Sequence, residues 1–215
     1  MKKLLFAVPK GRILDELNPL FKRSGIVPED DFFNDSSRKI IFSTNHQNLE
    51  MIKVRSFDVA TFVKFGGADL GVCGSDVLEE FPSNEIFSVL DLKIGKCRLS
   101  LAGSKNAAIN SENLLKNSHL RIATKYPNLV NRHFAGLGIQ AETVKLNGAI
   151  EIAPKLGLCD FIVDLVSSGK TLIENNMVEL QKILDVTSRL IVNRASLKIS
   201  NREINQLIKS FDEAI

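Results

Sequence analysis

Short apolar runs alternate along this chain with segments of helical periodicity, and glycines mark several of the changes. The run Leu4–Val8 is followed by a turn at Pro9–Arg12, then by apolar residues at helical spacing that end near Gly25. Such a run is typical of a buried parallel strand, and glycine is common just past a helix end. Because units of this kind recur along the chain, the sequence predicts an α/β fold with largely parallel sheets.

The number of strand-like segments favours two sheets over one. About ten such segments occur in 215 residues, which is many for one small sheet. A chain of this length folds as one or two domains. A short helix is predicted near Ala149–Leu156, and the C-terminal helix is predicted to open with Ser200 and Glu203, which have the spacing of a capping box.

Composition and charge exclude several classes of protein. Hydrophobic residues make up 44% of the chain and charged residues 25%, as in ordinary globular proteins. The net charge of +3 is far below the basic footprint of a nucleic-acid binder. No apolar stretch approaches the roughly 18 residues of a membrane span, and the N-terminal apolar run is too short for an export signal. We therefore expect a cytoplasmic protein that binds neither nucleic acid nor membranes.

The cysteines and histidines form no disulfide framework or metal-ligand pattern. An odd and widely spaced set of cysteines favours a reducing compartment, and the three in this chain are Cys73, Cys97 and Cys159. The three histidines also lack ligand spacing, and they are His46, His119 and His133. We expect no metal held by dedicated protein ligands.

The segment Asp164–Thr171 is the strongest indication of a ligand site. It continues an apolar strand and precedes a predicted helix, the order in which backbone N–H groups converge on an anion. Gly169 lets the chain bend close to a ligand, and Ser167 and Ser168 add hydroxyl donors. We call Ser167–Thr171 the glycine loop and predict that it binds phosphate. The alternative is an ordinary strand-to-helix turn rich in small residues.

Two other motif matches fit their sites poorly. The residues from Gly169 to Thr171 end like a Walker A motif, but Asp164 stands where that motif needs its first glycine, and its charge would repel the phosphates. The segment Gly136–Ala141 matches a GxGxxA dinucleotide-binding pattern, but it follows a predicted helix and precedes a strand, the reverse of the required order. Helix termination explains these glycines better.

Basic residues form a second cluster of candidates. Lys10 and Arg12 follow the first strand at its carboxyl end, where open α/β sheets bind ligands. Arg38 and Arg55 lie at the edges of the second and third predicted strands. Arginine presents a rigid fork suited to bidentate phosphate contacts, although a single arginine is more often a surface residue. These residues can form a binding site only if the fold brings them together.

A third cluster surrounds a small buried strand. Gly71 and Gly74 flank this strand, and Gly74 with Ser75 begins another predicted helix. Two interpretations stay open, a second anion or nucleotide site and tight packing of a helix on a sheet.

Taken in order, these and other segments resemble one family. The segments are Lys10–Arg12, Ser37–Lys39, Gly67–Gly71, Asp91–Cys97, Arg121–Pro127, Leu146–Glu151, Gly157–Asp160, the glycine loop and Ser188–Asn193. The series resembles the ATP phosphoribosyltransferases, which catalyse the first step of histidine biosynthesis, and it covers nearly the whole chain. Ser75 departs from the pattern, since many relatives have lysine there, and Ser168 occupies a variable position.

The resemblance implies a two-lobed architecture like that of the type II periplasmic binding proteins. Each lobe would contain a central mixed, mostly parallel sheet, with the active site in the cleft. Residues 1–93 and 184–215 would form lobe I, and residues 94–183 lobe II. The chain is similar to the short form of the family, which lacks a C-terminal regulatory domain. This implies a homodimer core that assembles with a regulatory subunit resembling histidyl-tRNA synthetase.

The reaction implied by the resemblance joins adenine N1 of ATP to C1 of phosphoribosyl pyrophosphate, giving phosphoribosyl-ATP and pyrophosphate. The implied phosphoribosyl contacts are Glu151, Asp164, Val166, Ser167, Ser168, Gly169, Lys170 and Thr171, with the two carboxylates on the ribose hydroxyls. The implied catalytic residues are Arg12, Arg38 and Lys10, and weaker nucleotide or pyrophosphate contacts are Arg55, Gly71, Gly74 and Ser75. Mg²⁺ would enter bound to the substrate. The alternative is a two-lobed solute-binding protein without catalysis.

Overall fold

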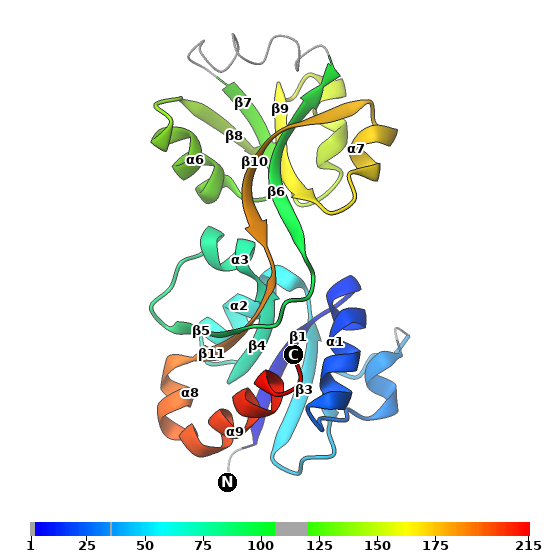
Figure 1. Cartoon of the computed structure of the whole chain (residues 1–215), viewed down its shortest axis with the longest axis vertical. Coiled ribbons are helices and arrows are strands. Elements are labelled where there is room, and N and C mark those ends of the chain that lie inside the picture. The colour runs from blue at the N-terminus through cyan, green and yellow to red at the C-terminus, as the bar shows by residue number, and fades with distance from the viewer. Residues whose placement is uncertain (1–2, 35, 106–119) are drawn as a thin grey trace. The chain divides into compact units, whose positions relative to one another are not determined.

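The computed structural model describes residues 3–34, 36–105 and 120–215, and the chain divides into two compact units (Figure 1). Unit 1 comprises Met1–Gly95 and Thr187–Ile215, and unit 2 comprises Lys96–Val186. The chain therefore passes between the units twice, after Gly95 and after Val186. The lobe boundaries expected from the sequence differ from these by two or three residues.

Unit 1 is built on a six-stranded sheet in the order β2-β3-β1-β4-β11-β5. Its strands are β1 (Leu4–Pro9), β2 (Ile41–Ser43), β3 (Leu49–Val54), β4 (Leu70–Gly74), β5 (Ile86–Asp91) and β11 (Ser188–Asn193). β1 pairs in parallel with β3 and β4, whereas β11 is antiparallel to both β4 and β5. As a result β1, β3, β4 and β5 run in one direction, and the sheet is mixed but mostly parallel, as the sequence predicts.

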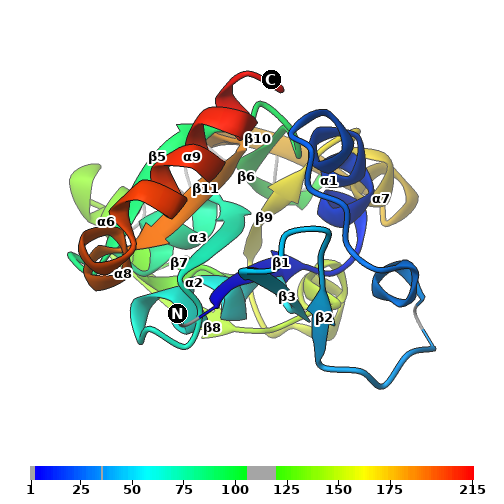
Figure 2. The same cartoon turned by 90° about the horizontal axis from the view of Figure 1, so that it is seen from below.

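Helices cover both faces of this sheet (Figure 2). One face packs against α1 (Arg12–Arg23), the 3₁₀ turn η1 (Asp30–Phe33) and α9 (Asn201–Asp212). The other packs against α2 (Ser56–Lys64) and α3 (Ser75–Glu80), and α8 (Arg194–Ile199) connects β11 to α9. Each face buries its own apolar cluster, so the sheet is an internal layer.

The last residues of the chain belong to unit 1 because their side chains complete its core. Phe211 of α9 packs edge-to-face with Phe6 of β1 and Phe21 of α1, at centroid distances of 5.8 and 5.9 Å. Such aromatic pairs contribute about 0.5–1.5 kcal/mol each beyond their buried area. The buried carboxylate of Asp69 also accepts a hydrogen bond of 2.6 Å from the Ser196 hydroxyl, which ties α8 to the start of β4.

Unit 2 is built on a five-stranded sheet in the order β10-β6-β9-β7-β8. Its strands are β6 (Cys97–Ser104), β7 (Leu120–Thr124), β8 (Ala141–Lys145), β9 (Phe161–Val166) and β10 (Met177–Val186). Among its described residues are the helices α6 (Pro127–Gly136) and α7 (Lys170–Glu174), with 3₁₀ turns η2 (Ile150–Ile152) and η3 (Pro154–Leu156). β7 is parallel to β8 and β9, and β6 is antiparallel to β9 and β10. The central strand β9 leads directly into the glycine loop.

Local structure departs from the sequence predictions near Ala149–Leu156 and at the start of α9. The helix expected near Ala149–Leu156 is instead the two 3₁₀ turns, the second of which begins at Pro154, a residue that has no N–H to donate. α9 follows Ser200 as expected, but the Ser200 side chain makes no capping hydrogen bond. Elsewhere, Gly138 has a φ of +72° just after the end of α6, which confirms helix termination as the explanation of the GxGxxA match.

Candidate functional site

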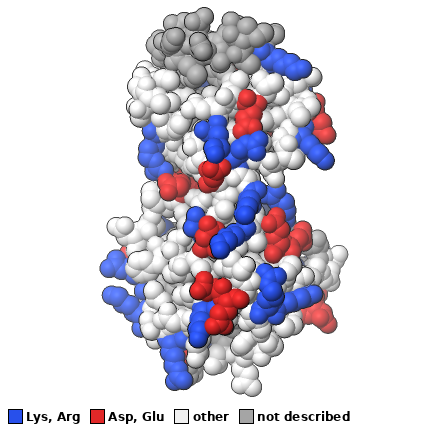
Figure 3. All heavy atoms as spheres, viewed as in Figure 1, with Lys and Arg blue, Asp and Glu red and all other residues white. Residues whose placement is uncertain are grey.

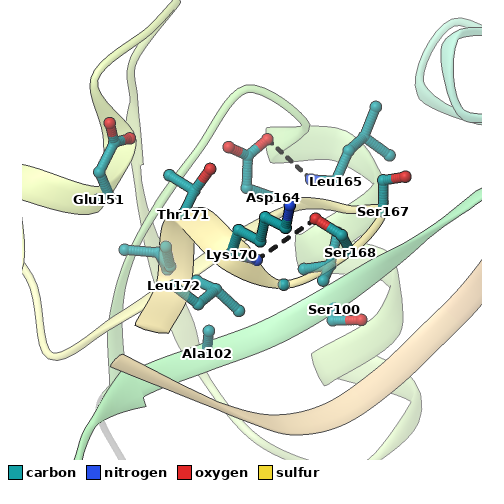
Figure 4. A pocket seen from close by; sticks show the side chains of 13 residues that line it. Ser100, Ala102, Glu151, Asp164, Leu165, Ser167, Ser168, Lys170, Thr171 and Leu172 are labelled. Carbon is teal, nitrogen blue, oxygen red and sulfur yellow. Dashed lines mark hydrogen bonds between the residues drawn. The ribbon is translucent and has the colours of Figure 1, made fainter. Parts of the chain in front are cut away.

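A cavity of about 190 Å³ opens at the carboxyl end of β9 in unit 2 (Figure 4). Its wall is formed by the end of β9, the glycine loop and the first turn of α7. Glu151 from η2 and Ser100 and Ala102 from β6 complete the lining. The structure thus brings all eight residues of the predicted phosphoribosyl site to one pocket.

The glycine loop owes its shape to Gly169. This residue has a φ of +77°, in the left-handed region that glycine adopts without steric cost, and it directly precedes α7. No side chain caps this helix, and the first amides of any helix have no carbonyl partner within it. The Lys170 amide makes only a long contact of 3.5 Å to the Ser168 hydroxyl. The loop therefore offers amide and hydroxyl donors to an anion in the cavity.

Two carboxylates and one ammonium group set the charge of the pocket. The Asp164 carboxylate accepts a hydrogen bond of 2.8 Å from the amide of Leu165, which fixes it at the end of β9. Glu151 approaches from the neighbouring 3₁₀ turn, and Figure 4 shows the Lys170 side chain reaching back across the loop towards Asp164. Carboxylates accept hydrogen bonds from sugar hydroxyls, whereas amides and ammonium groups bind phosphate oxygens.

The surroundings of the loop do not suit a Walker A site. α7 ends at Glu174 after five residues, because it turns at Asn175 and at Asn176, which has a φ of +56°. Asp164 points its charge at the same pocket as the loop. The phosphates of a nucleoside triphosphate bound as in Walker A proteins would be repelled by this carboxylate. The pocket therefore suits a single phosphate beside a hydroxylated group.

In unit 1 the basic candidates lie at one edge of the sheet. Lys10 follows β1 and Arg55 follows β3, and the two strands are parallel with Pro9 opposite Val54. Arg12 begins α1, where its guanidinium lies 3.8 Å from the Glu16 carboxylate, and it has further interactions. Exposed Arg38 precedes β2, whose first residue pairs near the end of β3. The fold therefore places all four basic residues at or near the carboxyl edge, although they come from three separate loops.

The glycines of the third cluster are tightly packed. A Cβ atom on Gly71 would lie 2.6 Å from the Val59 side chain of α2, and one on Gly74 would lie 1.9 Å from an Asp76 carboxylate oxygen. The Ser75 amide donates to the Thr187 carbonyl at 2.9 Å, and its hydroxyl accepts from the Thr187 amide at 3.3 Å. Helix–sheet packing accounts for these residues, and a role for them in nucleotide binding stays a prediction.

Several pocket residues are absent from the eight predicted phosphoribosyl contacts. The cavity is also lined by Ser100, Ala102, Ile162, Leu165 and Leu172. Ser100 is fully buried and lies opposite Asp164 in the β6–β9 ladder, so it reaches the pocket only through pairing between distant strands. Nothing in its local sequence signals this position.

The described residues show neither a metal-ligand cluster nor a membrane-spanning helix. In the described ranges no group of three or more His, Cys, Asp or Glu side chains is arranged to hold a metal ion, and His119 lies outside those ranges. Nor does any described helix have the length and apolar character of a membrane span. On the face shown in Figure 3, the described acidic and basic side chains are interspersed in each unit and do not separate by sign.

Comparison with known proteins places these features in a family. The family model of HisG, the ATP phosphoribosyltransferase, matches residues 55–213. The ATP phosphoribosyltransferase of Paramagnetospirillum magneticum is 56% identical over 99% of this chain and 96% of its own length. The ATP phosphoribosyltransferase (HisG:HisZ) complex of Thermotoga maritima contains a chain with 30% identity and a TM-score of 0.82, covering 98% of both chains.

A more distant likeness concerns the fold alone. The alkanesulfonate-binding protein SsuA of Xanthomonas axonopodis has 12% identity and a TM-score of 0.58, covering 100% of this chain and 73% of its own. That likeness confirms the periplasmic-binding-protein architecture without bearing on activity. The close sequence relatives, in contrast, are enzymes and match almost the whole chain. This protein is a member of the ATP phosphoribosyltransferase family.

Proposed function

We propose that the pocket at the end of β9 binds the phosphoribosyl group of phosphoribosyl pyrophosphate in the reaction of this family. That reaction joins adenine N1 of ATP to C1 of the ribose and releases pyrophosphate, the first step of histidine biosynthesis. The observation that carries the proposal is the arrangement of one loop rich in donors and two carboxylates around one small cavity. A ribose 5-phosphate carries the complementary groups, because its phosphate oxygens accept hydrogen bonds from the loop and its hydroxyls donate them to the carboxylates.

Within the pocket each group has a distinct role. The glycine loop, with Val166 at its start and Lys170 inside it, binds the 5′-phosphate through amides, hydroxyls and the ammonium group. Asp164 and Glu151 accept hydrogen bonds from the ribose hydroxyls. Holding the sugar at both ends fixes C1 relative to its attacking and leaving groups. Such positioning accounts for much of the rate acceleration in reactions that form no covalent intermediate with the enzyme.

The basic edge of unit 1 is suited to the leaving group. As the bond from C1 to pyrophosphate breaks, negative charge grows on the pyrophosphate oxygens, and fixed guanidinium groups stabilise that charge. Arg12 and Arg38 are the proposed ligands, with Lys10 and Arg55 as additional cations. Mg²⁺ would enter with the substrate and would neutralise part of the pyrophosphate charge, since this ion binds phosphate oxygens and water in preference to an all-protein cage. Adenine N1 carries a lone pair and needs no general base.

Assembly and compartment complete the proposal. The likeness to the chain of the Thermotoga maritima HisG:HisZ complex supports a hetero-oligomer with a regulatory subunit of the HisZ kind. We propose that this chain enters that assembly as a homodimer. Cys73, Cys97 and Cys159, all among the described residues, form no disulfide, which suits the reducing cytoplasm.

Pyrophosphate release tests the proposal directly. The protein is mixed with ATP, phosphoribosyl pyrophosphate and Mg²⁺, alone and with the regulatory subunit, and pyrophosphate is followed over time. Replacing Arg12 with alanine should lower turnover at least tenfold, which corresponds to about 1.4 kcal/mol of transition-state stabilisation. Unchanged kinetics would remove Arg12 from the site. No release from the unmodified protein in either mixture would favour a solute-binding protein.

A further inference from the structure

Arg98 lies in none of the motifs found in the sequence, but its side chain is hydrogen-bonded on both sides of its strand. It lies on β6, opposite Val166 of β9 and Asp185 of β10. Its Nε and Nη2 groups donate to the two carboxylate oxygens of Glu179 on β10, at 2.6 and 2.5 Å. Its Nη1 group donates to the carbonyl oxygen of Ser167 at 3.2 Å. One guanidinium therefore links β10 to the first residue of the glycine loop.

Glu179 fixes the orientation of this guanidinium. A bidentate pair holds the plane of the arginine as well as its position, which leaves Nη1 directed at the loop. Glu179 is itself held, because its Oε1 atom accepts a second hydrogen bond of 2.7 Å from Ser100, a fully buried residue of the cavity wall. Hydrogen bonding from Arg98 lowers the pKa of Glu179, and bonding to Glu179 raises the pKa of Arg98. The pair thus stays ionised throughout the neutral range.

The bond to Ser167 constrains the next peptide group. In a trans peptide the carbonyl and the following N–H point in opposite directions. Holding the Ser167 carbonyl towards β6 therefore directs the Ser168 N–H away from Arg98. Since three of the five guanidinium N–H groups already have these partners, the geometry favours a role through the loop over a direct contact with a ligand.

We propose that Arg98, oriented by Glu179 and Ser100, is a positioning residue that sets the Ser167–Ser168 peptide for phosphate binding. The inference rests on the proposed function of the glycine loop. It adds a supporting layer that reaches the loop from β6 and β10 and contributes no group to the substrate. Without Arg98 or without Glu179 the loop keeps its residues, but the Ser168 N–H loses its fixed direction.

The test compares Arg98→Ala, Glu179→Ala, the double variant and Arg98→Lys. A matched control is Arg121→Ala, since Arg121 forms an ion pair of 3.1 Å with Glu142 in the same unit but at the opposite end of the strands. Steady-state kinetics give kcat and the KM of each substrate. Calorimetry gives the affinity for phosphoribosyl pyrophosphate without ATP, and thermal unfolding gives stability.

Each single alanine variant should weaken phosphoribosyl pyrophosphate binding about tenfold while the KM for ATP changes less than twofold. The double variant should bind phosphoribosyl pyrophosphate as tightly as either single variant, because the two substitutions remove the same constraint. Arg98→Lys should recover part of the affinity, and the Arg121→Ala control should keep all of it.

Two results would overturn the inference. If Arg98→Ala weakens binding and Glu179→Ala does not, Arg98 contacts the ligand itself. If all the Arg98 and Glu179 variants lose only thermal stability and keep the affinity of the control, the pair merely joins strands. Failure of the unmodified protein to bind phosphoribosyl pyrophosphate would instead refute the proposed function of the loop, so the two failures are distinguishable.

Discussion

The β4–α3 turn of unit 1 and the β9–α7 turn of unit 2 share one local pattern, a buried strand, a glycine and the start of a short helix. Their polar groups have different partners. In the β4–α3 turn, both the amide and the hydroxyl of Ser75 are bonded to Thr187. In the β9–α7 turn, the residues of the glycine loop line a cavity.

The difference comes from residues far away in the sequence. Thr187 reaches Ser75 because β11 returns to unit 1 and pairs with β4, and the Asp76 side chain occupies the space beside Gly74. Around the glycine loop, the distant residues Ser100 and Glu151 form walls and leave the centre open. A glycine before a helix therefore marks a place where the backbone can approach something, and the tertiary partners decide whether that is protein or ligand.

The largest effect is expected from Gly169→Val. A β-branched residue in the left-handed region costs about 1–3 kcal/mol, so the loop should change conformation and lose its donors. We expect kcat/KM for phosphoribosyl pyrophosphate to fall on the order of 100-fold, or about 2.7 kcal/mol. Gly157→Val is the matched control, since Gly157 has a φ of +69° in the same unit but does not line the pocket. An equal loss in the control would show that the effect is one of folding.

Gly74→Ala should show the opposite profile. The new methyl would lie 1.9 Å from an oxygen of Asp76, so we expect overpacking to lower the free energy of unfolding by about 1–3 kcal/mol. The KM for phosphoribosyl pyrophosphate should not change in the folded protein. Chemical denaturation measures the first quantity, with Gly136→Ala as a control because a Cβ there meets nothing within 4 Å.

A double variant sharpens this test. If the Asp76 carboxylate is the obstacle, Gly74→Ala combined with Asp76→Ala should cost less stability than the two single changes added together. Strict additivity would show that another contact accounts for the loss.

Much of the fold is predictable because its strands are short apolar runs between turn residues. β1 (Leu4–Pro9) extends only one residue beyond the apolar run Leu4–Val8 from which the sequence predicts it. The helix α8 is not predicted, since it follows β11 without a turn. Its N-cap is Asn193, the last residue of β11, whose side chain accepts from the amides of Ala195 and Ser196. Periodicity cannot separate a helix of six residues from a loop.

The candidate site is predictable in part for the same reason. The glycine loop is continuous in sequence, so strand, glycine and helix order are enough to find it. Arg98 and Ser167 are 69 residues apart, and Arg98 and Glu179 are 81 apart, so their contacts depend on the strand order β10-β6-β9. Local periodicity carries no information about that order, and the return of β11 to unit 1 was implied only by family resemblance.

The smallest effects are expected from two serine variants, one in each turn, and these variants distinguish the two turns most clearly. Ser168→Ala removes one hydroxyl from the pocket and should raise the KM for phosphoribosyl pyrophosphate about fivefold, near 1 kcal/mol, with unfolding unchanged. Ser75→Ala removes the acceptor of the Thr187 amide and should lower the free energy of unfolding by about 1 kcal/mol, with both KM values unchanged.

The informative result for Ser75→Ala is a kinetic one. A several-fold rise in the KM for ATP, without a loss of stability, would make the β4–α3 turn a second anion site and restore the nucleotide role predicted for Ser75. A loss of stability alone would leave packing as the sufficient explanation, because a buried amide that loses its acceptor destabilises the fold whether or not a ligand is present. In either case, the role of each turn is assigned by asking whether its polar groups are bonded to protein or to a ligand.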